Sequence, residues 1–276
     1  MILRLDQAIG KTVSTVWAGT EWGRTAVRYA LDFYEFAGGG GEHPPLLQDI
    51  NTELLDDWLA RYPYASPSTQ NRRLAAISKV FTTARQRGYT GPVPYFPRKK
   101  EPQHRTRFLT RDEEFTLARK LSAQDEASWR AMTILIDTGM RLGELKRLHV
   151  ADLNHETGMI LIPFTKGGAS RSVPMSRRVA DILGDPKGAQ ALDEPTFRKH
   201  WEVARGQMGL ADDAQFVPHI LRHTCASRLV QSGVPLKVIQ EWLGHSDIAM
   251  TMRYAHLAPS NLSDALSSLE KFNAQS

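Results

Sequence analysis

The sequence is poor in cysteine and lacks a long apolar segment. Its 276 residues include one cysteine, Cys225, so neither an internal disulfide nor a cysteine-based zinc cluster is available. A single cysteine is typical of reducing compartments. No apolar stretch approaches the roughly 20 residues that cross a membrane, and Asp6 lies where a secretory signal would be apolar. We therefore expect a globular cytoplasmic protein.

Acidic residues are scarce in one part of the chain, where basic residues accumulate. Residues 1–107 contain 15 Lys and Arg against 10 Asp and Glu, whereas the remainder contains 20 of each. Within 71–107, Glu101 is the one acidic residue among ten basic ones. A short basic run is usually a solvated surface, but this excess continues from a helix into a linker, which favours a nucleic-acid partner. The expected DNA contacts are Arg72, Arg73, Lys79, Arg98, Lys99, Lys100, Arg105 and Arg107.

A proline-rich segment divides the chain. Residues 91–107 contain four prolines and little periodicity, which predicts an extended interdomain linker. Thr110 followed by Glu113 is a capping-box pattern, so we expect a new helix to begin there. The expected organisation is a helical DNA-binding domain at 1–90, a basic linker at 91–107, and a second domain at 108–276.

Apolar periodicity predicts helices before the linker and a mixed domain after it. The segments GMILIPF (158–164) and RSVP (171–174) are rich in strand-forming residues, and the glycines between them predict a hairpin. The expected fold is therefore mainly α with a small β-hairpin or sheet. The expected apolar faces are Val27, Ala30, Leu31 and Tyr34 in the helix around 24–36, and Leu74, Ile77, Val80 and Phe81 in the helix around 66–88.

Cationic and polar residues stand at the edges of the elements expected after the linker. They occur in the segments TGMRLGEL, TKGG, HILRH, LGHS and TMRYAH. Taken singly, each has a structural explanation, such as a solvated turn for Lys166 or a buried aromatic for Tyr254. His219 and Arg222 share a helix face near an expected N-terminus, where anions are favoured. The complete set is Arg141, Lys166, His219, Arg222, His245 and Tyr254.

Together these groups suit the transfer of a phosphodiester to tyrosine without a metal ion. Two guanidiniums can hold the phosphate oxygens with a bidentate geometry that lysine cannot supply. A tyrosine hydroxyl, with an ordinary pKa of about 10, needs help to lose its proton. Lysine can protonate the departing sugar oxygen, and histidines can orient the phosphate and exchange the tyrosine proton.

The order and spacing of these residues resemble the tyrosine recombinases, the phage integrase family. The family pattern of Arg, Lys, His-x-x-Arg, His or Trp, and Tyr is met at all six positions between 138 and 256. The N-terminal part resembles the family's core-binding domain more weakly, through INTELLDDWLARY and SPSTQNRRLAAISKVF. The resemblance implies a helical core-binding domain and an α+β catalytic domain that close on duplex DNA as a C-shaped clamp.

The resemblance also implies a role for each motif residue. Arg141 and Arg222 would clamp the phosphate, and Lys166 would be the general acid to the leaving 5′-oxygen. Tyr254 would be the nucleophile. His219 would be a proton acceptor or phosphate ligand, His245 a further phosphate contact, and Glu144 a supporting residue; His223, Cys225 and His256 are expected to be structural.

The implied reaction needs no cofactor and proceeds through a 3′-phosphotyrosyl intermediate and a Holliday junction. The implied partners are two duplex recombination sites, four protomers in all, and a host DNA-bending or directionality factor as a further candidate. Integration of phage or prophage DNA is the first interpretation. We expect the protein to lack the additional N-terminal arm-binding domain that some phage integrases carry. The alternatives are an Xer-type resolvase of chromosome or plasmid multimers, a type IB topoisomerase and a non-cleaving DNA-binding regulator.

The C-terminal tail has an apolar stripe of its own. Within 260–276, apolar residues recur at helical spacing, and such a stripe must be buried against something. Packing on its own domain and docking into a neighbouring protomer are both open from the sequence. The stripe consists of Leu262, Ala265, Leu266, Leu269 and Phe272.

Overall fold

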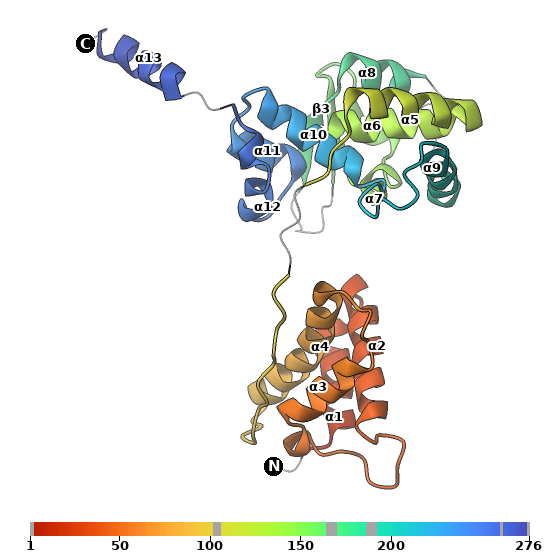
Figure 1. Cartoon of the computed structure of the whole chain (residues 1–276), viewed down its shortest axis with the longest axis vertical. Coiled ribbons are helices and arrows are strands. Elements are labelled where there is room, and N and C mark those ends of the chain that lie inside the picture. The colour runs from red at the N-terminus through yellow and green to blue at the C-terminus, as the bar shows by residue number, and fades with distance from the viewer. Residues whose placement is uncertain (1–2, 102–105, 164–169, 186–191, 260–261, 275–276) are drawn as a thin grey trace. The chain divides into compact units, whose positions relative to one another are not determined.

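The computed structural model describes residues 3–101, 106–163, 170–185, 192–259 and 262–274. The chain divides into two compact units, Met1–Gln103 and His104–Ser276. Figure 1 shows helices in both units and the small sheet in the second. The described residues are mainly helical with one three-stranded antiparallel sheet, which confirms the expected fold class.

The first unit is built from helices. They are α1 (Leu5–Thr12), which continues into a π-helical turn, α2 (Glu21–Phe36), α3 (Thr52–Ala60) and α4 (Pro67–Gln86). Asn51 and Ser66 cap α3 and α4 by accepting backbone N–H groups, and Pro67 occupies the first turn of α4, where its missing N–H is not needed. The expected apolar face of α4 is confirmed, because Leu74, Ile77, Val80 and Phe81 are all buried.

The expected apolar face of α2 was wrong in part. Leu31 is 48% exposed, whereas Ala26, Ala30 and Phe33 are fully buried. These three follow the i, i+4, i+7 spacing of a helix face, which is rotated away from the predicted one. Phe33 packs edge-on against Trp58 of α3, with ring centroids 5.0 Å apart. Helix α2 therefore turns the face that carries Phe33 toward α3, and Leu31 is left toward solvent.

The beginning of the proline-rich segment is attached to the first unit. The Thr52 hydroxyl accepts a hydrogen bond from the Tyr95 backbone N–H at 3.1 Å. The Asn71 side chain donates to the Lys99 carbonyl and accepts from the Lys99 N–H, both at 2.8 Å, and also donates to the Glu101 carboxylate. Residues 95–101 are thus held along α3 and α4, so the predicted interdomain linker is not free over this length.

The second unit places helices around a short sheet. After α5 (Arg111–Gln124) and α6 (Glu126–Thr138), the four-residue helix α7 (Leu142–Leu145) leads to β1 (Leu153–Asn154), β2 (Met159–Ile162) and β3 (Arg171–Pro174). The strands are antiparallel in the order β1-β2-β3, and Ile160 pairs with Val173. The β2–β3 pair confirms the expected strands. Strand β1 was not expected, because two residues are too few to show the alternation of apolar and polar side chains that predicts a strand.

Helices complete the second unit after the sheet. They are α8 (Arg177–Gly184), α9 (Glu194–Gln207), α10 (Ile220–Gln231), α11 (Leu236–Leu243), α12 (Ala249–Met252) and α13 (Leu262–Asn273). The expected capping box at the start of α5 is present, with Thr110 and Glu113 bonded reciprocally. Helix α10 packs against both α6 and α11, and this arrangement positions the site (Figure 1).

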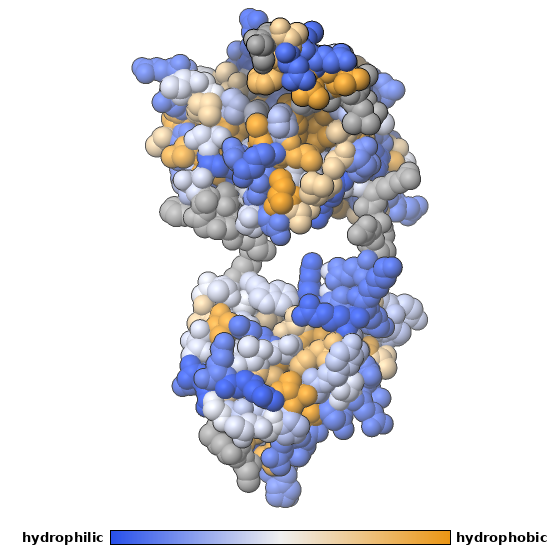
Figure 2. All heavy atoms as spheres, turned by 90° about the vertical axis from the view of Figure 1, so that its left-hand side faces the viewer, coloured by the Kyte–Doolittle hydropathy of each residue, from blue (hydrophilic) through white to orange (hydrophobic). Residues whose placement is uncertain are grey.

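Hydrophilic residues are interspersed with apolar ones on the face of each unit drawn in Figure 2. Most apolar side chains of the two units are withdrawn into separate cores, one around Phe33 and Trp58 and the other around Trp201 and Phe216. Among the described residues, no helix has the length and apolar character needed to span a membrane.

Candidate active site

Arg222 lies at the centre of the site, in the first turn of α10, and is 2% exposed. Its two terminal nitrogens donate to the carbonyls of Gly139 at 2.7 Å and Leu243 at 2.6 Å. These carbonyls lie at the C-terminal ends of α6 and α11, where left-handed Gly139 and Gly244 terminate the helices with φ of 64° and 66°. Because helix C-termini favour cations, two helix ends stabilise this buried guanidinium.

Glu144 joins two further guanidiniums to this centre. Its carboxylate accepts from Arg141 Nη1 at 2.8 Å and from Arg171 Nη2 at 2.7 Å, and its side chain is 2% exposed. It also accepts from the Arg141 backbone N–H at 2.9 Å, which closes a capping box on α7. Burial alone would raise the pKa of Glu144, but the hydrogen bonds from Arg171 and Arg141 lower it to about 2.

Arg171 did not stand out in the sequence. Its side chain points inward from β3, 6% exposed, and its Nε donates to the Trp242 carbonyl at 2.9 Å. A Cβ atom on Gly244 would lie 2.8 Å from Arg171 Cδ, so the glycine before His245 leaves room for this arginine. The available signal was a lone charged residue on the core-facing side of a strand.

Two guanidiniums therefore bind one carboxylate, and the charge of that carboxylate also acts on a third guanidinium, that of Arg222. Burial, followed by the charges of Arg141 and Arg171, lowers the pKa of Arg222 to about 9, and Glu144 opposes this effect. Arg222 remains a cation at neutral pH. The cluster retains positive charge beyond that of the carboxylate, which suits an anionic ligand.

Two of the motif histidines lie near this cluster. His245 Nδ1 is 2.8 Å from the Thr251 hydroxyl. Burial and then the charges of Arg222 and Arg141 lower the pKa of His245 to about 4, so the ring is neutral at pH 7. His219 is the residue before α10, and Arg222 and Arg141 are also among the charges that act on it.

Tyr254 is buried with its hydroxyl on a histidine. Its ring is 2% exposed and packs with Val230, Ile239 and Leu243 in a small cluster between α10 and α11. The Tyr254 hydroxyl lies 2.7 Å from His223 Nδ1. Burial raises the pKa of Tyr254, while Arg253 and Arg222 oppose that rise. His223 was expected to be structural, so this contact with the expected nucleophile was missed.

The other expected site residues divide into three groups. Lys166 and Arg105 lie outside the described residues. Arg73 and Arg107 have intramolecular partners: Arg73 pairs with Asp32 at 2.8 Å and stacks on the Tyr62 ring, and Arg107 binds Glu113 and Asp213. The third group is solvent-accessible: Arg72, Arg98, Lys99 and Lys100 are exposed, and Lys79 on α4 is half-buried.

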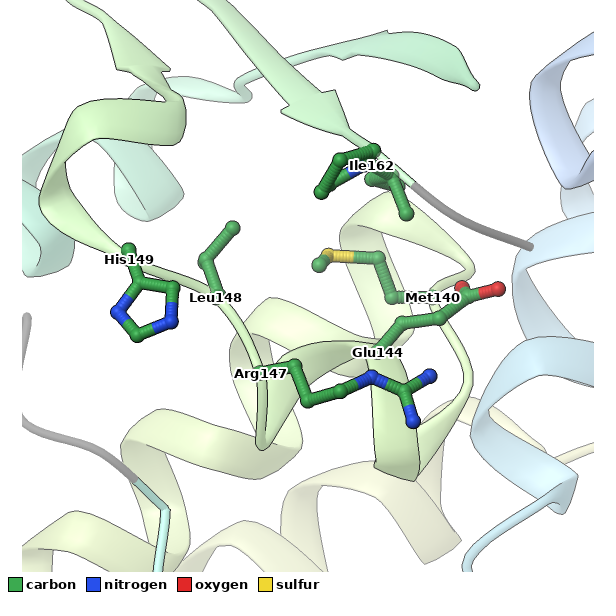
Figure 3. A pocket seen from close by; sticks show the side chains of 7 residues that line it. Met140, Glu144, Arg147, Leu148, His149 and Ile162 are labelled. Atoms are coloured by element: carbon green, nitrogen blue, oxygen red, sulfur yellow. The ribbon is translucent and has the colours of Figure 1, made fainter. Parts of the chain in front are cut away.

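A small pocket lies behind the carboxylate of Glu144. In Figure 3, Leu148 and His149 line one side, and Met140 and Glu144 line the other. Its volume is about 220 Å³, below the roughly 300–1,000 Å³ of small-molecule sites, so we assign it no ligand. Within the ranges that the structure describes, no three His, Cys, Asp or Glu side chains form a group able to hold a metal ion.

Comparison with known proteins gives consistent matches. The family model described as "Phage integrase family" matches residues 107–261. The integrase of Escherichia phage P2 is 31% identical over 231 residues, an alignment that covers 81% of this chain and 66% of that integrase. Tyrosine recombinase XerD of Vibrio cholerae is 29% identical over 264 residues, covering 85% of this chain and 81% of XerD.

Solved structures agree at the level of the fold. The Tn1549 transposon integrase, solved with a circular intermediate DNA, superposes with a TM-score of 0.73 at 17% identity, covering 98% of this chain and 99% of that one. The similarity therefore extends over both compact units of this chain.

Proposed function

Since this chain belongs to the phage integrase family of tyrosine recombinases, we propose that it is a site-specific DNA recombinase that cleaves and rejoins DNA through a 3′-phosphotyrosyl intermediate. The observation that carries the proposal is the position of Tyr254, which is buried between α10 and α11, where the charges of Arg253 and Arg222 act on its hydroxyl. The integrase of phage P2 and the Tn1549 integrase, solved with DNA, support the same conclusion.

In the proposed reaction, the Tyr254 oxygen attacks the scissile phosphorus and the bond to the 5′-oxygen breaks. Arg141 and Arg222 stabilise the charge that develops on the non-bridging oxygens. Lys166 donates a proton to the leaving oxygen, and His219 and His245 contact the phosphate. Because the phosphotyrosyl ester keeps the energy of the broken bond, a second strand can be joined without ATP or another cofactor.

The direct test is the formation of a covalent adduct. Duplexes that bind the protein are selected from a randomised library and rebuilt as nicked suicide substrates, on which the released strand cannot be rejoined. We expect an SDS-stable protein–DNA adduct that forms in the presence of EDTA, with the protein joined to a 3′ end. Stable binding without any adduct would indicate a DNA-binding regulator instead.

Integration of phage or prophage DNA is the first biological role, because the integrases of phages P2 and 186 are among the relatives. An Xer-type resolvase is the second candidate, because XerD of Vibrio cholerae aligns over most of both chains. A plasmid assay separates them. An integrase should join two different sites on separate molecules, and a resolvase should reduce a dimer with two identical sites to monomers.

We further propose that residues 98–100 hold the DNA backbone. The Asn71 side chain fixes the Lys99 main chain with two hydrogen bonds of 2.8 Å, which holds three adjacent exposed cations at a defined place against α4. Basic residues on such a track position DNA through its phosphates and carry no sequence information.

Replacing Arg98, Lys99 and Lys100 together with alanine should weaken binding to all duplexes alike. If each cation contacts one phosphate, the slope of log affinity against log salt should decrease by up to about 3. The control replaces Lys11, Arg24 and Arg28, exposed cations of the same unit outside the expected contact set, and should leave the slope unchanged. Loss of affinity for one sequence with an unchanged slope would indicate base readout instead.

We also propose that α13 docks into a neighbouring protomer of a tetramer on two DNA sites. Leu266, Leu269 and Phe272 are 57%, 56% and 71% exposed, so these side chains of the stripe are not buried on their own unit. An apolar helix face of this kind requires a partner in the assembled state.

Deletion of residues 260–276 should leave monomer stability within about 0.5 kcal/mol, as expected for exposed residues, and preserve binding to one site. Pairing of two sites in gel shifts, and strand exchange, should be lost. Leu269→Asp should reproduce the pairing defect, and Glu270→Ala, at an exposed neighbour, should not. A lower melting temperature with normal pairing would show that the tail packs on its own domain.

A further inference from the structure

The hydroxyl of Tyr254 forms a hydrogen bond with His223, a histidine outside the expected set of catalytic residues. We propose that His223 is the base that removes the Tyr254 proton during cleavage, and that it can do so only once the scissile phosphate is bound. This inference rests on the proposed function, since it assigns the proton acceptor of the same reaction.

The geometry identifies His223 as the proton acceptor. Its Nδ1 lies 2.7 Å from the Tyr254 oxygen, a distance suited to direct proton transfer. His219 lies one helical turn earlier, and its ring meets the His223 ring edge-on with centroids 4.7 Å apart. His223 thus stands between His219 and the nucleophile. With His223 as the proton acceptor, His219 can contact the phosphate. One imidazole ring then does not have to perform both tasks.

The surrounding charges explain why the phosphate must bind first. Burial lowers the pKa of His223 to about 3, and each charge facing it in the described structure acts in the same direction. A neutral His223 accepts a hydrogen bond from Tyr254 but is too weak a base to remove its proton, so the free protein keeps its nucleophile protonated. The groups that face His223 are His219, the residue before α10, Arg222 of α10, His245 after α11, and Arg253 after α12.

A bound phosphodiester places a negative charge near the two guanidiniums of this group, Arg222 and Arg253. Protonation of His223 then becomes more favourable, because the charges that opposed it are compensated. The free enzyme is thereby protected from activating Tyr254 in the absence of DNA, and binding of the substrate supplies the missing basicity. Nucleophile activation is in this way coupled to occupancy of the phosphate clamp.

The step balances without an additional reactant. The O–H bond of Tyr254 breaks as its oxygen bonds to phosphorus, and the proton passes to Nδ1 of His223, whose Nε2 already carries a proton. The bond from phosphorus to the 5′-oxygen breaks with its electron pair on that oxygen, which takes a proton from Lys166. In the reverse step His223 returns its proton to the tyrosine oxygen when the strand is rejoined.

His223→Asn is the main test, because the Asn side chain can place an acceptor oxygen near the former Nδ1 but cannot take a proton at neutral pH. Single-turnover rates of adduct formation are measured on saturated nicked duplexes between pH 5 and 10. We expect the variant to be slower by about 10²-fold or more at pH 7 and to recover part of the rate as pH rises. His256→Asn, at an exposed histidine two residues after Tyr254, should match the wild type.

A second substrate distinguishes the base from the general acid. With sulfur in place of the bridging 5′-oxygen, the leaving group no longer needs a proton, whereas the Tyr254 proton must still be removed. The His223→Asn defect should therefore persist on this substrate, and a Lys166→Ala defect should be largely relieved. A His223→Asn rate within threefold of wild type, or a defect abolished by the sulfur substrate, would overturn the assignment.

Histidine ¹⁵N NMR on the wild-type protein tests the same bond without any substitution. His223 should be neutral at pH 5, with its proton on Nε2 and a hydrogen-bonded Nδ1. A proton on Nδ1 would mean that the imidazole donates to Tyr254, which would refute its role as a base. If the wild type forms no adduct at all, the proposed function fails; if it does and His223→Asn matches it, this inference alone fails.

Discussion

Tyr254→Phe should bind a selected duplex as tightly as the wild type and form no covalent adduct. The phenylalanine ring can occupy the same place among Val230, Ile239 and Leu243, because the substitution removes only the hydroxyl. The oxygen that would attack phosphorus is absent, so the loss of cleavage is complete within detection. Adduct formation on an SDS gel and binding in a gel shift, measured on one suicide substrate, check both statements.

The fold of this variant should be slightly less stable. Removal of the hydroxyl leaves His223 Nδ1 without its 2.7 Å partner, and an unpaired buried polar atom of this kind costs about 1 kcal/mol. Tyr64→Phe is the matched control, since Tyr64 is fully exposed and should change neither cleavage nor stability. An SDS-stable adduct formed by Tyr254→Phe would show that another residue is the nucleophile.

Glu144→Gln should produce the second large effect, on the free energy of unfolding. The substitution removes the one charge that Arg141 and Arg171 share, and it leaves the buried guanidinium of Arg171 and the half-buried one of Arg141 without their anion. Breaking a buried ion pair in this way costs roughly 3–5 kcal/mol. Urea denaturation at pH 7 measures the loss. Glu241→Gln breaks an exposed pair with Lys237 and should cost no more than about 1 kcal/mol.

The same carboxylate predicts how stability depends on pH. The pKa of Glu144 falls from its usual 4.5 to about 2 on folding, which corresponds to roughly 3 kcal/mol of stability. This contribution is present above pH 4.5, where the unfolded chain is also ionised, and is lost as pH falls toward 2. Glu144→Gln should lack this part of the acid dependence. An unchanged acid profile in the variant would show that other carboxylates dominate it.

Regular patterns in the sequence were sufficient for much of the fold. The buried face of α4, the capping box at Thr110 and the β2–β3 pair each follow from local preferences that the structure keeps. The face of α2 could not be predicted in this way, because Val27 and Leu31 compete with Ala26 and Phe33 at similar spacing. The contact between Phe33 and Trp58 decides between them, and it joins residues 25 positions apart.

The sequence predicted those site residues that a motif identifies by residue type and order. It did not predict the residues whose role depends on a contact made in the folded chain. Arg171 and His223 carry no motif of their own, and each acquires its role from a partner distant in sequence: Glu144 for the first and Tyr254 for the second. Charge counting likewise could not distinguish Arg73, which pairs with Asp32, from exposed neighbours such as Arg72. Only the folded chain shows which cations are already neutralised.

The anchoring of Arg222 on the carbonyls of Gly139 and Leu243 has a consequence for mutational scanning. Every residue type has a main-chain carbonyl, so no side-chain substitution removes either acceptor. A mutational scan will therefore contain no variant that lacks one of these two hydrogen bonds for want of its acceptor. Their influence will emerge instead at the two glycines, where a methyl group would approach Leu243 and Arg171 to 2.8 Å. Tolerance maps of this protein should therefore show intolerant glycines at 139 and 244, and these positions would report the geometry of an arginine that lies far from both in sequence.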